Sequence, residues 1–183
     1  MLLLHTCCAP CSAAVIEWLL NRDIRPTLFY FNPNIFPLKE YETRKTESIR
    51  YATKLGLEII DGEYQHNVWL REVSGMEKEA ERGTRCLICF KIRLLESARI
   101  AHERGFKQIA TTLASSRWKN IEQITQAGEW AVSQYEGVTF LNKNWRKEGL
   151  SERRNILLAE NGFYNQRYCG CEFSIENKRN YLS

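Results

Sequence analysis

The sequence lacks any apolar run long enough to cross a bilayer, which excludes a transmembrane helix and a membrane partner. It also lacks internal repeats, low-complexity segments and linkers, and 44% of its 183 residues are hydrophobic against 26% charged, which excludes a wholly disordered chain. The first apolar stretch is too short for a signal peptide and has no basic leader, so we expect an intracellular, cytoplasmic protein. The length predicts a single domain over residues 1–183.

The chain also lacks a strong net charge of either sign. The chain has 26 Lys and Arg against 22 Asp and Glu, a net charge of +4, which permits a nucleic-acid partner without requiring one. No phosphate-binding glycine loop is present, because the turn after the first predicted strand carries cysteines where an ATP-binding loop carries glycines. This disfavours an ATP-dependent tRNA-modifying enzyme.

Apolar runs alternate with amphipathic ones along the whole chain. Strands are expected at residues 2–6, 27–31, 57–60, 107–112 and 138–141. Helices are expected at 12–20, 38–55, 86–104, 120–134 and 147–161, with a broken helical region at 66–83 and a short terminal helix after a loop at 169–171. The alternation predicts one Rossmann-like α/β domain with a mainly parallel sheet of about five strands flanked by helices. The segments after strands one, two and four, residues 7–8, 32–37 and 111–119, should meet at one rim.

Seven cysteines stand out, and all of them fall in three tight clusters. These clusters are Cys7, Cys8 and Cys11; Cys86 and Cys89; and Cys169 and Cys171. An odd number cannot pair completely in disulfides, and a reducing compartment disfavours structural disulfides in any case. Buried core cysteines have no reason to cluster, so the pattern favours a thiophilic metal or thiol chemistry.

The spacing within the clusters leaves several chemistries open. Cys7 and Cys8 lie on a strand-to-helix turn, and Cys86 and Cys89 form a CxxC motif near a helix start. Together they offer four thiolates, which fit zinc or a [4Fe–4S] cluster. Structural zinc would leave the other three cysteines without a role. The CxC pair around Gly170 would form a strained, easily reduced disulfide, or would ligate a metal.

Two readings without iron compete with an iron–sulfur enzyme. One is a zinc-stapled RNA-binding module without redox catalysis, and the other is a thiol–disulfide oxidoreductase that uses either close cysteine pair. Trp118 lies in a basic stretch on the expected rim, where base stacking and surface packing are equally good explanations. His5 is interpreted as a hydrogen-bonded core histidine rather than a ligand.

Several sequence strings occur around the cysteines in a specific order. They are His-Thr-Cys-Cys-Ala-Pro at 5–10, Phe-Asn-Pro-Asn-Ile at 31–35 with Glu40, Tyr41 and Arg44, Arg-Cys at 85–86, Cys-Phe at 89–90 with Arg93, Thr-Thr-Leu at 111–113 with Ser116 and Lys119, and Gln-Arg-Tyr-Cys-Gly-Cys-Glu-Phe-Ser at 166–174. In these strings the chain resembles the cobalamin-independent epoxyqueuosine reductases, the QueH family, over nearly its whole length. It departs from the pattern at 115–117, where Ser-Pro is expected.

The resemblance implies a reaction and a set of roles. It implies reduction of epoxyqueuosine to queuosine at the wobble position of tRNA, the last step of queuosine synthesis. Cys7, Cys8, Cys86 and Cys89 would hold a [4Fe–4S] cluster, Cys169 and Cys171 would be a redox-active pair, and Cys11 would be a catalytic ligand of a second, mononuclear iron. Removing the epoxide oxygen as water takes two electrons and two protons. A cluster usually passes one electron at a time, so a second redox partner is needed beside it, and an open iron could act as a Lewis acid.

The expected partners are tRNA carrying epoxyqueuosine and an electron donor such as ferredoxin or flavodoxin. Candidate tRNA-binding residues are chosen from their positions in the matching strings and on the predicted rim. They are Asn32, Asn34, Tyr41, Arg85, Ser116, Arg117, Lys119 and Arg167.

Overall fold

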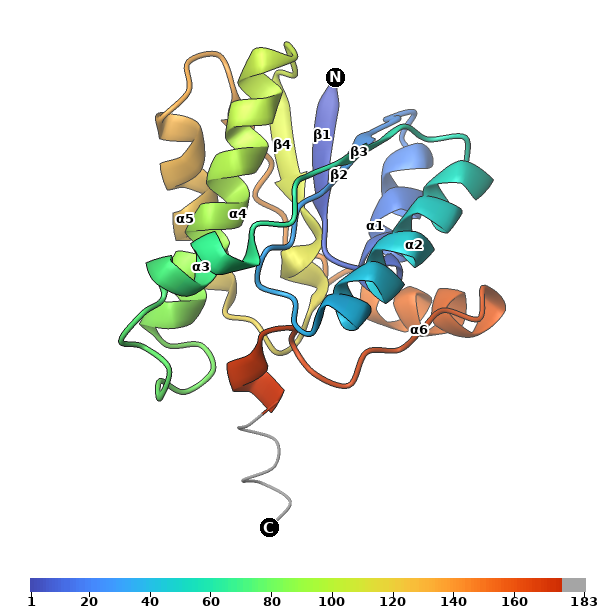
Figure 1. The fold of residues 1–183 in the computed structure, drawn as a ribbon. Coiled ribbons are helices and arrows are strands. Elements are labelled where there is room, and N and C mark those ends of the chain that lie inside the picture. The colour runs from blue at the N-terminus through green and yellow to red at the C-terminus, as the bar shows by residue number, and fades with distance from the viewer. Residues whose placement is uncertain (176–183) are drawn as a thin grey trace.

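A parallel five-stranded sheet forms the centre of the computed structural model, which describes residues 1–175 (Figure 1). Its strands are β1 (Leu2–Thr6), β2 (Thr27–Tyr30), β3 (Ile59–Asp61), β4 (Gln108–Thr111) and β5 (Thr139–Phe140), in the order β3-β2-β1-β4-β5. Every neighbouring pair is parallel, and all five residues of the central strand β1 are buried. The structure confirms the predicted α/β fold class.

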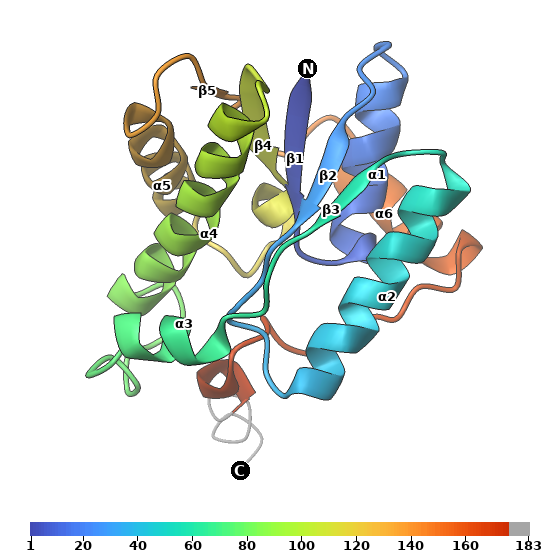
Figure 2. The same ribbon diagram turned by 45° about the horizontal axis from the view of Figure 1, so that its top comes forward.

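Helices cover both faces of this sheet (Figures 1 and 2). On one face lie α1 (Ala9–Leu20), α2 (Leu38–Lys54) and α6 (Leu150–Glu160), and on the other lie α4 (Thr84–Glu103) and α5 (Ile121–Ser133). The short α3 (His66–Glu72) contacts α4, and a 3₁₀ turn, η1 (Thr112–Ser115), follows β4 directly. Among the described residues, no helix has the length and apolar character needed to span a membrane.

The strand order changes direction between β1 and β4. From β1 the chain passes to β2 and β3 on one side, then returns to place β4 and β5 on the other. In open parallel sheets such a point leaves a crevice beyond the carboxyl ends of the two strands, where ligands bind. Cys7 follows β1 directly, and Thr112 follows β4 directly. The fold therefore places the first cysteine cluster at the ligand-binding position of this architecture.

Two helices begin earlier than the sequence predicts, and the earlier start of α1 brings Cys11 into that helix. Helix α1 begins at Ala9 rather than residue 12, because Pro10 fits the first helical turn, where no backbone N–H is needed. Cys8 is thus the N-cap, and Cys11 lies one turn further along the same helix. Helix α4 begins at Thr84, so both cysteines of the CxxC motif lie inside it. Helix α6, in contrast, begins only at Leu150.

Candidate metal centre

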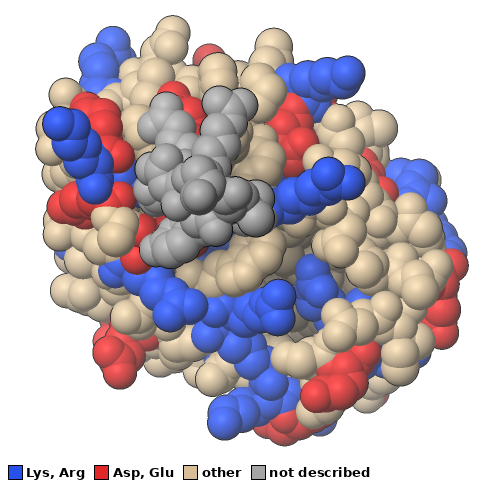
Figure 3. All heavy atoms as spheres, turned by 90° about the horizontal axis from the view of Figure 1, so that it is seen from below, with Lys and Arg blue, Asp and Glu red and all other residues tan. Residues whose placement is uncertain are grey.

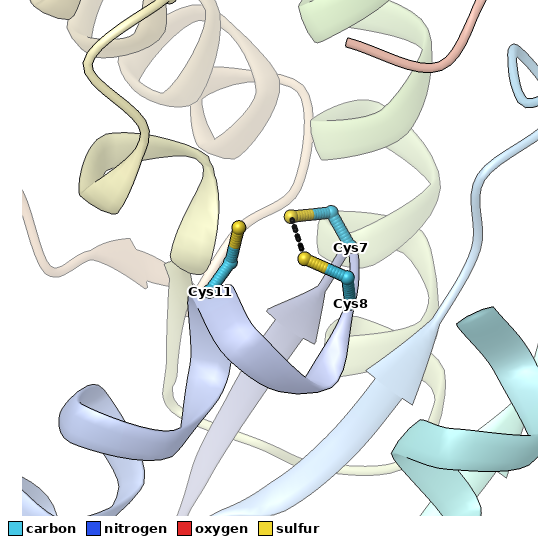
Figure 4. A group of neighbouring side chains, drawn as sticks. All are labelled: Cys7, Cys8 and Cys11. Carbon is cyan, nitrogen blue, oxygen red and sulfur yellow. Dashed lines mark hydrogen bonds between the residues drawn. The ribbon is translucent and has the colours of Figure 1, made fainter. Parts of the chain in front are cut away.

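Cys7, Cys8 and Cys11 form a compact buried group at the start of α1 (Figure 4). Their three sulfur atoms lie within 4.8 Å of one another, and Cys7 Sγ lies 3.8 Å from Cys8 Sγ. Each side chain is at most 5% exposed. Within residues 1–175 no other His, Cys, Asp or Glu side chains bring three ligand atoms this close together. The structure therefore brings together the three cysteines of the first sequence cluster, and among residues 1–175 no comparably close group of three includes Cys86 or Cys89.

Side chains from distant segments donate hydrogen bonds to these sulfurs. Gln166 Nε2 donates to Cys8 Sγ at 3.0 Å and to Cys11 Sγ at 3.5 Å. Thr112 Oγ1 donates to Cys7 Sγ at 3.6 Å, and the backbone N–H of Cys7 donates to the same hydroxyl at 3.3 Å. Sequence reasoning missed the role of Gln166, because no local pattern links it to a turn more than 150 positions earlier.

The three thiols differ in their tendency to lose a proton. Hydrogen bonds from the thiols of Cys11 and Cys8 hold the pKa of Cys7 well below its usual value. Burial raises the pKa of Cys8, and the hydrogen bond between Cys11 and Cys7 raises that of Cys11. Cys7 is therefore the thiol of this group that loses its proton most readily, and the amino end of α1 favours its negative charge.

The other four cysteines form a second group. Cys86 and Cys89 come from the first two turns of α4, and Cys169 and Cys171 come from the loop after α6. Burial raises the pKa of Cys86 to about 11 and that of Cys171 to about 12, and the charge of Cys169 adds to both. Burial also raises the pKa of Cys89, again with a contribution from Cys169. Cys169 thus lies beside the three others, and none of the seven cysteines forms a disulfide.

The loop that carries Cys169 and Cys171 is held from beneath by the segment after β2 and by α2. Arg44, 2% exposed, donates from Nη1 to the Cys169 carbonyl at 3.2 Å and from Nη2 to the Tyr168 carbonyl at 3.3 Å. Gly170 has a φ of 143°, and its carbonyl accepts from Phe36 N at 2.9 Å. A Cβ at Gly170 would lie 3.1 Å from Asn34 Nδ2, so the glycine allows the backbone to approach this closely.

Two buried cations lie near both cysteine groups. Lys119 is 7% exposed, and although burial lowers its pKa, the charges of Cys169, Cys7 and Cys11 raise it overall. Arg93 is 2% exposed, and its charge lowers the pKa of both Cys7 and Cys89. Buried thiolates are stable only with such compensation. The site is therefore built to hold negative charge on sulfur.

His5 belongs to the scaffold beneath the site. It is 0% exposed, and its Nε2 lies 3.1 Å from the Phe31 carbonyl, which can only accept, so Nε2 carries the proton. Its Nδ1 then accepts from the Thr111 hydroxyl at 2.8 Å. Burial, with the charge of Arg93, lowers the pKa of His5 to about 3, so the ring is neutral. The interpretation as a hydrogen-bonded core histidine is confirmed.

Two cavities border the cysteine groups and a third adjoins them, and the segment Ser115–Lys119 contributes to the lining of all three. The largest, about 920 Å³, has Cys11, Gln166 and Trp118 in its wall. A small cavity of about 20 Å³ lies against Cys86, Cys169 and Cys171. A third, of about 290 Å³, is lined by basic side chains. Both cysteine groups therefore border space that a ligand or solvent can enter.

The predicted tRNA-binding residues fall into an exposed set and a buried set. Arg117 and Arg167 are exposed and line the largest cavity together with Ser116. Lys119 and Arg85 are buried beside the small cavity. Arg85 Nη1 is already occupied, since it donates to the carbonyls of residues 76 and 77 at 2.8 and 2.9 Å.

The remaining three of these residues lie in the interior, away from the three cavities. Asn32, Asn34 and Tyr41 are at most 2% exposed. Asn32 accepts from Arg93 Nη2 at 2.5 Å and donates to the Thr6 carbonyl at 2.9 Å. Tyr41 lies against the ring of Tyr30, with ring centroids 5.4 Å apart. Their side chains are therefore buried in the interior of this structure and line none of the three cavities.

Comparison with known proteins identifies relatives over almost the whole chain. A family model described as epoxyqueuosine reductase QueH matches residues 2–177. The chain is 46% identical over 176 residues to the epoxyqueuosine reductase QueH of Haemophilus influenzae, an alignment that covers 96% of this chain and 72% of that protein. It is 45% identical to the protein of that name from Acinetobacter baylyi, over 96% of this chain and 81% of the relative. The chain is 35% identical to the epoxyqueuosine reductase QueH of Thermotoga maritima, over 97% of this chain and 91% of that protein.

Proposed function

The chain belongs to the epoxyqueuosine reductase QueH family, and we propose that it reduces epoxyqueuosine in tRNA with an iron–sulfur cluster held by its own cysteines. It is an oxidoreductase of queuosine biosynthesis. The observation that carries the iron–sulfur part is the group of three buried thiols at the point where the strand order reverses. Because tRNA is the substrate, we place the reaction in the cytoplasm.

The donor set suits a thiophilic metal cofactor. We assign Cys7, Cys8, Cys86 and Cys89 to a [4Fe–4S] cluster and Cys11 to a second iron. Four thiolates match the ligand number of such a cluster, and Cys11 lies beside Cys7 and Cys8 within 4.8 Å. The cluster would supply electrons one at a time, and an iron with an open position would act as a Lewis acid toward the epoxide oxygen.

The remaining side chains prepare the site for a charged, reducible centre. Lys119 and Arg93 supply buried positive charge that offsets thiolates of both groups. Gln166 and Thr112 donate hydrogen bonds to the first group. Cys169 and Cys171, held by Arg44, are free thiols in the structure, and we assign them the role of a dithiol that supplies two electrons and two protons when it is oxidised to a disulfide.

The largest cavity is the proposed entry for the modified nucleoside. Its volume of about 920 Å³ lies in the range of ligand-binding pockets, and Cys11 lies in its wall. Trp118 offers an aromatic surface beside it, and Arg117 and Arg167 carry positive charge at its edge. An electron donor such as ferredoxin or flavodoxin would restore the reduced state after each turnover.

The test is anaerobic incubation of the iron-loaded protein with a reductant and tRNA that carries epoxyqueuosine, followed by mass spectrometry of the nucleosides. The proposal expects queuosine, lighter than epoxyqueuosine by one oxygen atom. The zinc-loaded protein, which keeps the thiols bound but cannot change oxidation state, is the matched control. Equal conversion by the zinc-loaded protein would exclude the iron–sulfur mechanism.

A further inference from the structure

A cavity of about 290 Å³ adjoins the cysteine site and is lined by positively charged side chains. Its main lining residues come from the loop before α4, the loop before α5, the first turn of α5 and the segment after β5. They are Arg82, Arg117, Lys119, Asn120, Glu122 and Arg146. Four of these six carry positive charge, and Glu122, which is exposed, is the only acid among them. Figure 3, which looks onto the end of the molecule where the strands terminate, shows Lys and Arg side chains gathered beside a hollow.

Among the described residues, no carboxylate oxygen lies within 4.0 Å of the charged atoms of these four cations, and Lys119 faces cysteine thiols instead. Burial and the nearby charge of Arg82 lower the pKa of Arg146. Arg146 Nε is also buried and makes no hydrogen bond. A cluster of positive charges without carboxylate partners, together with a donor that makes no hydrogen bond, is typical of an anion-binding site.

Two of the arginines are held in place by hydrogen bonds to backbone carbonyls. Arg82 donates from Nε and Nη2 to the carbonyls of Trp118 and Arg117, both at 3.1 Å, and Arg146 Nη2 donates to the Lys119 carbonyl at 2.7 Å. Arg82 itself has a φ of 70°, and its carbonyl accepts from Gln123 Nε2 at 2.9 Å. A left-handed conformation at a residue other than glycine costs free energy, and such strain is commonly kept at functional sites.

The basic cavity continues into the cysteine site. Arg82, Lys119 and Asn120 line both this cavity and the one that contains Cys86, Cys169 and Cys171. Arg117 lines both this cavity and the largest one. An anion bound here would therefore lie next to whatever occupies the cysteine site.

We infer that this basic cavity binds one phosphate of the RNA chain next to the nucleotide that is reduced. The inference rests on the proposed function, and it names the contact that fixes the RNA in register. Asn120 Oδ1 already accepts from the backbone N–H groups of Glu122 and Gln123, so side-chain guanidinium groups, and not the end of α5, would hold the phosphate. Guanidinium groups suit this task because they bind phosphate oxygens in pairs.

The test pairs a protein variant with a change in one phosphate. Arg117→Gln is the informative variant, because the carbonyl of Arg117, rather than its side chain, takes part in the contact with Arg82. Arg104→Gln is the matched control, because Arg104 is exposed and ends α4 just before β4, at the opposite edge of the sheet. Binding of a fluorescent anticodon stem–loop RNA is measured for each protein, with single methylphosphonate linkages placed in turn on either side of the wobble nucleotide.

One linkage should behave differently from the others. Neutralising it should weaken binding to the wild-type protein and to Arg104→Gln roughly tenfold, the effect of losing one charged hydrogen bond. Neutralising the same linkage should reduce the affinity of Arg117→Gln for the RNA only slightly. In Arg117→Lys, part of the sensitivity to that linkage should return. The salt dependence of log K should also become shallower by about 0.7 in Arg117→Gln.

The outcomes separate this inference from the proposed function. If every neutral linkage weakens Arg117→Gln as much as it weakens the wild-type protein, the cavity does not bind that phosphate, even where the wild-type enzyme reduces epoxyqueuosine. If the coupling to one linkage is found but no reduction occurs, the phosphate site stands and the reductase proposal fails. A melting temperature equal to that of Arg104→Gln shows that Arg117→Gln is folded.

Discussion

Gln166 Nε2 lies 3.0 Å from Cys8 Sγ and donates a hydrogen bond to it across 158 positions of the sequence. This contact joins the segment that carries Cys169 and Cys171 to the turn after β1 that carries the first cysteine group. The segment that carries Cys169 and Cys171 is therefore tied to the first group by a side-chain amide, and the charge of Lys119 acts on thiols of both groups.

Replacing Gln166 with Leu should make a bound iron–sulfur cluster harder to reduce. Hydrogen bonds to cluster sulfurs stabilise the more negative, reduced state. Loss of one such bond, worth on the order of 1 kcal/mol, should lower the midpoint potential by roughly 40 mV. The measurement is a redox titration followed by electron paramagnetic resonance. Gln134→Leu, an exposed change at the end of α5, is the control, and equal potentials in the two variants would contradict the role of Gln166.

Replacing Gly170 with Ala should displace the loop that carries Cys169 and Cys171. An alanine at position 170 would keep an unfavourable positive φ, and its Cβ would lie 3.1 Å from Asn34 Nδ2. Gly75→Ala is a matched control, since Gly75 has a φ of 83° and a Cβ placed there would have no atom within 4 Å. Both variants should lose about 1–3 kcal/mol from backbone strain. The rate at which a thiol reagent modifies Cys169 should change only in Gly170→Ala, and unchanged rates would show that the close approach is unimportant.

The stability of the protein should fall in acid partly because of His5. Its pKa is about 3 in the folded chain against 6.5 for an unperturbed histidine, so the unfolded chain binds more protons between these values. The stabilisation is complete above pH 6.5 and is lost as the pH falls toward 3, by up to about 1.4 kcal/mol per pH unit. His5→Gln keeps a donor for the Phe31 carbonyl but does not titrate. Urea unfolding of the wild-type protein and of His5→Gln should show a difference in the free energy of unfolding that shrinks as the pH falls. A difference that stays constant with pH would contradict a neutral His5 ring.

Metal binding should release protons from the second cysteine group. In the metal-free protein at pH 8 the thiol of Cys86, with a pKa of about 11, is protonated, so a metal that binds its thiolate must displace that proton. Zinc affinity should therefore rise about tenfold per pH unit for each thiol proton displaced. Calorimetry in buffers of different ionisation enthalpy counts the protons.

Cysteine-to-serine variants then assign the ligands. Cys86→Ser should release one proton fewer on zinc binding than the wild-type protein does. Cys171, with a pKa of about 12, is also protonated at pH 8, and as a redox thiol rather than a ligand it should leave the count unchanged when it is replaced. A lower proton count in Cys171→Ser would make it a ligand and contradict the assigned ligand set.

The strands and their parallel arrangement follow closely from the sequence pattern, whereas the strand order comes from the structure alone. Each predicted strand overlaps an observed one, and the rim at which residues 7–8 and 111–119 meet is present. Helix starts were harder to predict, because Pro10 fits the first turn of α1, so this helix begins before the predicted start at residue 12. That difference changed the site, since it placed Cys11 one helical turn from Cys8.

The candidate cysteines could be found from clustering, but their partners could not. Arg44, Arg93 and Gln166 contact the site only through tertiary packing, which no local spacing encodes. Asn32 and Tyr41 match family strings, yet their side chains support loops from the interior. The basic cavity was missed for the same reason, because Arg82 and Arg146 are far apart in sequence and converge on one loop.

The most direct test of the account is a comparison of iron-loaded and zinc-loaded protein acting on tRNA that carries epoxyqueuosine, without oxygen and with a reductant present. The account predicts that mass spectrometry of the nucleosides finds queuosine with the iron-loaded protein and unchanged epoxyqueuosine with the zinc-loaded one. Conversion by the zinc-loaded protein, or none by protein with a full complement of iron, would contradict reduction through an iron–sulfur centre held by these cysteines.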